Sequence, residues 1–101
     1  MHNAQPPARR TVVVDIERER DYWRQHYQDL PRARAMRSFA RYWQVLSAAY
    51  DVFLNHPRAD AEEGLHLFLQ REGVRASPLT GTEARDVFGR VWSRIQGTPA
   101  P

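Results

Sequence analysis

The hydrophobic positions of the chain follow a helical period most clearly in the run FARYWQVLSAAYDVFL, residues 39–54. Apolar side chains recur there at i, i+3, i+4 and i+7, and Trp43 lies near the middle of the resulting stripe. The apolar arc spans about 200°, whereas a surface helix needs only about 100° to face a core. A helix with so wide an arc must contact neighbours on two sides. We therefore expect it to be the central helix of the domain and Trp43 to be a core residue.

Three other segments have narrower apolar stripes and clear start and stop signals. They cover residues 15–30, 60–72 and 80–96. The last two begin with Asp or Thr followed three residues later by Glu, which is the capping-box spacing. Pro31 ends the first segment, and Ser38 is the expected N-cap of the central helix. The pattern predicts an all-α fold, a small bundle of four helices around a central apolar helix.

The N-terminal residues have no such period. Their Pro, Gln and Arg content cannot offset the entropy of ordering, so we predict a disordered tail over 1–14 and a single helical domain over 15–97. The longest purely apolar run, 12–14, is far shorter than the roughly 20 residues that cross a bilayer. The first ten residues also lack the apolar segment of a secretory signal. We expect no membrane association and a cytoplasmic location in a bacterium.

The composition removes several classes of chemistry. The chain has no cysteine, which excludes disulfides, zinc–thiolate sites and cysteine nucleophiles. All 15 basic residues are arginine, against 12 acidic residues, for a net charge of +3. Arginine suits phosphate binding, but a G+C-rich genome also favours arginine codons. Because the charge is nearly balanced, we favour the codon explanation over a concentrated nucleic-acid-binding face.

The segment ERDYWRQHY, residues 19–27, resembles the opening of a family of small uncharacterised bacterial α-helical proteins that begin with E/D-x-Tyr-Trp-Arg-x-x-Tyr. The similarity continues through Tyr42 and Tyr50 and in LTGTEARDVFGRVW, residues 79–92. An apolar segment replaces the acidic, glycine-containing tyrosine segment of that family. The resemblance implies an α-helical domain with no assigned activity and a loose association with stress. It implies no catalytic residue.

The histidines and serines do not form a recognisable catalytic site. Glu62 and His66 are four residues apart and could supply two metal ligands, but a metal site needs three or four. We interpret them as a solvated pair on one helix face. The serines lack a Gly-x-Ser-x-Gly motif, and no glycine-rich phosphate loop is present. We expect no enzyme, no metal and no cofactor.

A basic connection before the central helix is the first candidate binding site. It contains Arg32, Arg34, Arg37 and Arg41. The last three fall at i, i+3 and i+7, so they would share a face able to bind phosphate if the helix began early. The alternative, which we favour, is that these arginines form ion pairs with Asp29, Asp51 or the acidic third helix.

A second candidate is the apolar seam formed by Val45 and Val52 on the central helix. If no helix of the same chain covers this seam, it is an exposed apolar strip that a protein partner or a homodimer would close. Our first hypothesis is therefore a non-enzymatic protein–protein interaction module. The alternative is arginine-dependent binding of nucleic acid or another polyanion, which steep salt dependence would distinguish.

Overall fold

The computed structural model describes residues 14–97, and every regular element in that range is helical. The elements are α1 (Ile16–His26), the 3-10 turn η2 (Tyr27–Asp29), α2 (Ala33–Met36), α3 (Phe39–Asn55), α4 (Ala61–Leu69), α5 (Glu72–Arg75) and α6 (Gly81–Ile95). The predicted all-α class is confirmed for this part of the chain. No helix in it is long and apolar enough to cross a membrane.

The predicted tail lies outside the described residues, with the exception of Val14. That side chain is partly buried and packs against the hydrophobic core. Helix α1 starts two residues later, where the Asp15 carboxylate accepts a hydrogen bond from the backbone N–H of Arg18. The core therefore reaches at least one residue further towards the N-terminus than the predicted domain start.

The predicted helix starts are confirmed by their capping contacts. The Ser38 hydroxyl accepts from the backbone N–H of Arg41 at the start of α3. Asp60 and Thr80 each complete a capping box with the Glu three residues later, so two backbone N–H groups are satisfied at the start of both α4 and α6.

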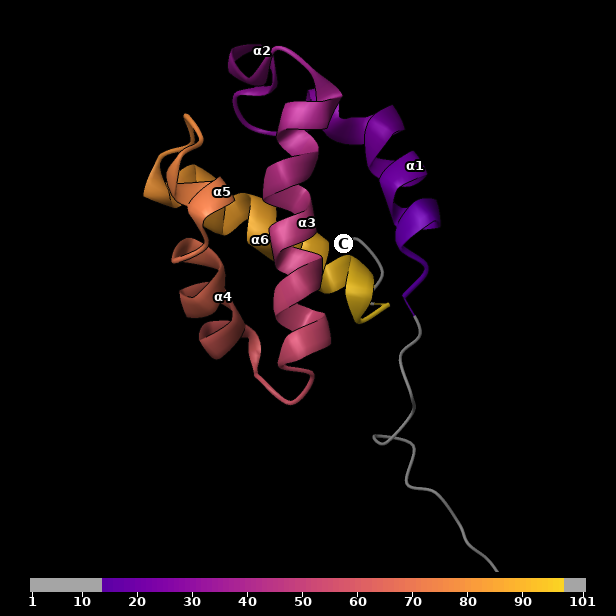
Figure 1. The fold of residues 1–101 in the computed structure, drawn as a ribbon, viewed down its shortest axis with the longest axis vertical. Helices are drawn as coiled ribbons and strands as arrows, with labels where there is room; N and C mark the ends of the chain where they lie inside the picture. Colours follow the sequence, from indigo (N-terminus) through magenta and orange to yellow (C-terminus); the bar gives the residue numbers. More distant parts are fainter. Residues whose placement is uncertain (1–13, 98–101) are drawn as a thin grey trace, which may run out of the picture.

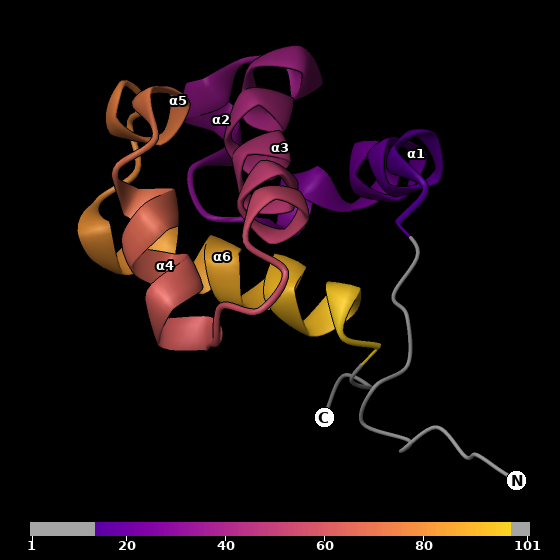
Figure 2. The ribbon, with the colours of Figure 1, turned by 60° about the horizontal axis from the view of Figure 1, so that its bottom comes forward.

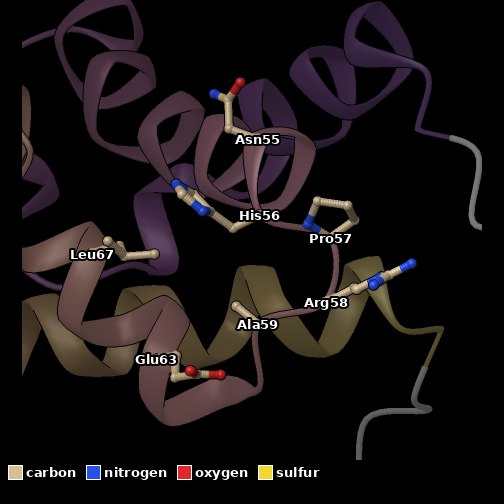
Figure 3. Close-up of a pocket in the computed structure, with 7 residues that line it drawn as sticks. All are labelled: Asn55, His56, Pro57, Arg58, Ala59, Glu63 and Leu67. Atoms are coloured by element: carbon tan, nitrogen blue, oxygen red, sulfur yellow. The ribbon is translucent and has the colours of Figure 1, made fainter.

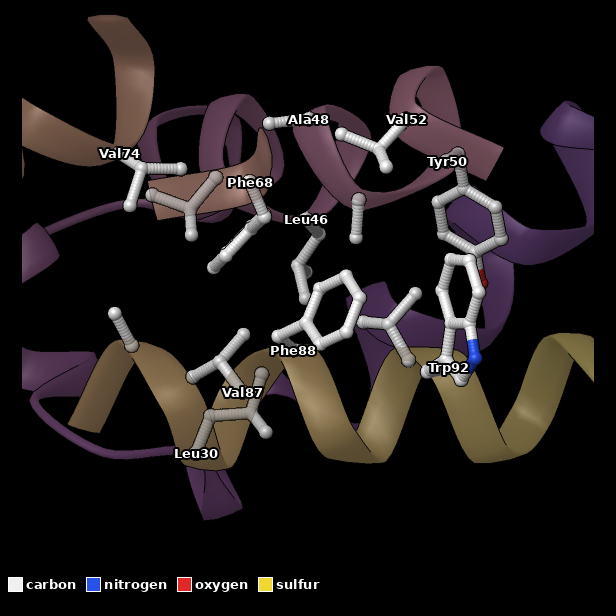
Figure 4. Close-up of a cluster of buried hydrophobic side chains, with 14 of the residues drawn as sticks. Leu30, Leu46, Ala48, Tyr50, Val52, Phe68, Val74, Val87, Phe88 and Trp92 are labelled. Atoms are coloured by element: carbon white, nitrogen blue, oxygen red, sulfur yellow. The ribbon is translucent and has the colours of Figure 1, made fainter. Parts of the chain in front are cut away.

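Helix α3 is the centre of the fold and packs against α1, α2, α4, α5 and α6. Figure 1 shows α3 between α1 on one side and α4 and α5 on the other, with α6 crossing behind it. Figure 2 shows the same order from another direction. The largest buried side chains come from α2, α3, α4 and α6, and part of this cluster is drawn in Figure 4. The wide apolar arc of α3 thus has the two-sided cover that its sequence requires.

The exposed seam predicted on α3 does not exist. Val45 is 1 % exposed and Val52 is fully buried within the same chain. Helices α4, α5 and α6 all pack on α3, and α5 is not among the four helices that the sequence predicts. The hypothesis that Val45 and Val52 form a homodimer interface is therefore wrong.

Trp43 was expected to be a core residue, but its side chain is partly exposed. Its ring lies between those of Phe39 and Tyr50, with centroid distances of 5.9 Å and 6.0 Å. Phe39 and Tyr50 both contact α1, through Arg24 and Trp23, and α1 makes few contacts with the rest of the fold. The fully buried aromatic residues in this region are Tyr42 and Tyr50.

The helix predicted over 60–72 ends early, at Leu69. Gly73 follows it in the sequence and would suit a left-handed helix cap, but its φ is not positive. Gly73 lies inside α5 instead. A Cβ at this position would stand 3.3 Å from the carbonyl oxygen of Gln44 in α3. Glycine suits this position because the backbones of α5 and α3 approach each other closely.

Candidate functional site

The basic connection forms a single helical turn, α2, bounded by two arginines in left-handed conformations. Arg32 has φ 58° and Arg37 has φ 72°, a region that residues other than glycine seldom adopt. Arg37 breaks the helical path before α3 begins. Arg34, Arg37 and Arg41 therefore do not share one continuous helix face, and that part of the prediction is wrong.

Buried contacts hold this turn in place. The side chains of Leu30, which precedes the turn, and of Met36, its last residue, are in the core. The hydroxyl of Tyr42 donates a hydrogen bond of 2.5 Å to the carbonyl of Pro31. Burial of the Tyr42 ring raises the pKa of its hydroxyl well above the usual value, so the hydroxyl stays a donor at neutral pH. The turn is thus anchored from inside, and its arginines are directed outwards.

Two of the four arginines share a surface pocket. It has a volume of about 580 Å³ and is lined by Tyr27, Gln28, Ala33, Arg34 and Arg37. Both guanidinium groups are exposed, and neither forms an ion pair with another residue of the 14–97 range. The described residues give this lining two cations, an amide and a phenol, and no carboxylate. This arrangement is suited to an anionic ligand.

Arg32 and Arg41 lie outside this pocket. The Arg32 Nε donates a 2.8 Å hydrogen bond to Glu83 of α6. The pKa of Glu83 is lowered, first by the backbone N–H of Thr80 and then by Arg32. The ion-pair alternative therefore holds for Arg32, although its partner is not one of the predicted acidic residues. Arg41 is exposed and has no ion-pair partner in the described part of the chain.

A polar network between α1, α3 and α6 was not predicted. The Tyr50 hydroxyl accepts from the Trp23 indole N–H at 2.8 Å and donates to Glu19 at 2.5 Å. Arg94 binds Glu19 through two nitrogens, at 2.7 Å and 3.2 Å, and its guanidinium lies 3.5 Å from the ring centroid of Tyr22.

We interpret this network as one that stabilises the fold, because its polar groups bond to one another. Burial and the hydrogen bond to Glu19 both raise the pKa of the Tyr50 hydroxyl. The partners are a satisfied carboxylate, a phenol and an indole, and the nearby guanidinium is already paired. The sequence signal was present in the segment ERDYW, residues 19–23, but its partners lie 27 and 75 positions further along the chain.

A second surface pocket lies at the loop between α3 and α4 (Figure 3). His56 and Arg58 are among its lining residues, and so is Glu63, whose carboxylate is engaged in the α4 capping box. His66, which the sequence pairs with Glu62, has its ring Nε2 2.9 Å from the side-chain amide nitrogen of Gln70. Within residues 14–97 no three acidic or histidine side chains are grouped closely enough to hold a metal ion.

The chain matches no protein-family model, no curated protein and no solved structure. The resemblance of residues 19–27 to a bacterial helical family stays a prediction. The site must therefore be interpreted from its own residues, and the pocket of Arg34 and Arg37 is the candidate.

Proposed function

We propose that the protein is a non-enzymatic helical module that binds polyanions through Arg34 and Arg37. The observation that supports this is the pair of exposed guanidinium groups in one pocket with no carboxylate partner among residues 14–97. A guanidinium fork binds two oxygens of a phosphate or sulfate at once. Because the turn is anchored by the buried side chains of Leu30 and Met36, the backbone that carries both arginines is in place before a ligand arrives.

The protein–protein interaction hypothesis has lost the surface on which it depended. Val45 and Val52 are in the core, and the exposed large hydrophobic residues of the described range are Ile16 and Leu54. These lie on different helices, and single exposed apolar side chains are common on protein surfaces. We therefore place polyanion binding first. We propose that it operates in a bacterial cytoplasm, which a chain of 101 residues without cysteine suits.

Fluorescence anisotropy with a charged, base-free probe tests the proposal. The probe is a fluorescein-labelled abasic oligodeoxynucleotide of about 12 units, a length within the site size of single-strand binders. We expect saturable binding to the full chain, with affinity that falls steeply as salt is added. The double variant Arg34→Gln/Arg37→Gln should bind more weakly, and its slope of log Kd against log salt should be smaller by about 1 to 2.

The matched control is Arg58→Gln/Arg85→Gln, which removes the same charge from exposed positions outside the pocket. This variant should keep most of the affinity and salt slope. Equal weakening by both double variants would mean that only net charge matters, and it would overturn the proposal. An absence of binding by the full chain at low salt would do the same.

A further inference from the structure

A row of aromatic rings begins at the arginine pocket and continues along α3. Tyr27 lines the pocket, and its ring centroid lies 5.4 Å from that of Phe39. The Phe39 ring is in turn 5.9 Å from Trp43. All three side chains are only partly buried, so each packs one side on the core and leaves part of its ring open to solvent. We call Tyr27, Phe39 and Trp43 the aromatic row.

The tryptophan of this row is more exposed than the other two tryptophans of the chain. Trp23 and Trp92 are each 4 % exposed, whereas Trp43 is accessible, and the chain has three tryptophans in total. Partly exposed aromatic surface that is not needed to close a core is typical of a binding surface. Among the described residues, the row is also the place where accessible aromatic rings adjoin the unpaired arginines.

A further cation lies over the row. The guanidinium carbon of Arg24 is 5.4 Å from the centroid of the Phe39 ring. Asp21 is the acidic neighbour of Arg24, at 3.2 Å, and both side chains are exposed. This exposed ion pair is weak and exchangeable, so it leaves Arg24 able to bind a second anion. The surface therefore combines guanidinium groups with ring surface over a short distance.

Single-stranded nucleic acid is the polyanion that uses both features. Its phosphates match the guanidinium groups, and its unpaired bases have flat surfaces that stack on aromatic side chains. A duplex hides those surfaces inside its stack, and polyphosphate or a sulfated polysaccharide has none. Building on the proposed polyanion function, we infer that the protein binds single-stranded nucleic acid, with Arg34 and Arg37 on the phosphates and the aromatic row in contact with bases.

The test compares two probes that carry the same charge. A labelled oligothymidylate of about 12 nucleotides offers bases, and the abasic oligomer of the same length does not. We expect the full chain to bind oligothymidylate about 5- to 150-fold more tightly, as one or more base stacks would give. It should also bind it more tightly than a duplex of equal length. Fluorescence of the wild-type protein should be quenched by oligothymidylate, because Trp43 is the accessible tryptophan.

Two matched variants test whether the preference for oligothymidylate depends on the aromatic row. Trp43→Leu should lose most of the preference for oligothymidylate while keeping its affinity for the abasic probe. Phe53→Leu is the control, because Phe53 is also a partly buried aromatic residue of α3 but packs on Trp92, at 5.8 Å between centroids. It should keep the preference. Circular dichroism checks the fold of both variants, and the quenching measurement needs no variant.

The outcomes separate this inference from the proposed function. Equal affinity for both probes, with Arg34→Gln/Arg37→Gln weakening both, would overturn the single-strand inference and leave polyanion binding in place. Duplex binding as tight as that of oligothymidylate would also overturn the inference. If neither probe binds, the proposed function itself fails.

Discussion

The indole N–H of Trp23 donates a 2.8 Å hydrogen bond to the hydroxyl of Tyr50, which joins α1 to the central helix. The same hydroxyl donates to Glu19, and Glu19 binds Arg94 of α6. Helix α1 packs mainly on α3 and η2, so this network provides much of its attachment. Tyr27, which follows α1 directly and lines the arginine pocket, is positioned by that attachment.

Removing the Tyr50 hydroxyl should destabilise the protein clearly. In Tyr50→Phe the Trp23 N–H loses its acceptor in a buried position, and an unsatisfied buried group costs about 1–3 kcal/mol. Urea unfolding followed by circular dichroism measures the loss. Tyr22→Phe is the control, since the Tyr22 hydroxyl forms no hydrogen bond within residues 14–97, and it should change stability by less than about 0.5 kcal/mol. Equal losses in the two variants would contradict a stabilising role for the network.

Stability should fall in alkaline solution. Burial raises the pKa of both Tyr42 and Tyr50 above the ordinary value of 10.0. Above that pH the unfolded chain releases these protons while the folded chain keeps them, so rising pH favours unfolding. The stabilisation is complete below pH 10.0 and decreases as the pH rises above it. Urea midpoints measured from about pH 8 to 11 should show the fall, with a shallower fall in Tyr50→Phe. A midpoint that does not change over this range would contradict the burial of these hydroxyls.

Two glycine substitutions should have opposite effects. A Cβ at Gly64 would lie 2.9 Å from the Phe88 ring and 3.2 Å from the Trp92 ring, so Gly64→Ala should destabilise by about 1–3 kcal/mol. A Cβ at Gly89 meets no atom within 4 Å, and Gly89 lies within α6. Gly89→Ala should therefore stabilise by about 0.5–1 kcal/mol through helix propensity. Thermal unfolding of both variants checks the pair, and stabilisation by Gly64→Ala would contradict the close packing of α4 on α6.

Charge on the buried seam of α3 should prevent folding. In Val45→Asp/Val52→Asp two carboxylates replace side chains that are 1 % and 0 % exposed, and an unpaired buried charge is very costly. We expect an unfolded chain by circular dichroism. Ala40→Asp puts the same group at an exposed position in the first turn of α3 and should fold normally. A folded, monomeric double variant would instead support the interface that the sequence predicted.

The sequence predicted the main helices well because their signals are local. The capping box at Asp60 needs only the Glu three residues later, and the apolar period of α3 is contained in one run. The width of that apolar stripe also predicted that α3 packs against neighbouring helices on two sides. These features depend on contacts within one or two turns of helix, so a single chain segment contains them.

The remaining features depend on contacts between distant segments. Arg37 takes a left-handed conformation directly after the buried side chain of Met36, and no local signal in the sequence marks this break. The sequence leaves the cover of Val45 undecided, because it predicts four helices and α5, which also packs on α3, is not among them. The bond from Arg94 to Glu19 spans 75 positions. The arginine pocket was predicted only in part, since its two cations were included but Tyr27 and Gln28 were not.

The most direct test of polyanion binding at the arginine pocket is an NMR titration of the ¹⁵N-labelled full chain with the abasic oligonucleotide. We expect the largest shift changes at the side-chain Nε–H groups of Arg34 and Arg37 and at backbone amides of 27–37, with saturation and with reversal by added salt. Largest changes at 55–59, around the pocket of Arg58, or small uniform changes at all exposed arginines, would contradict it.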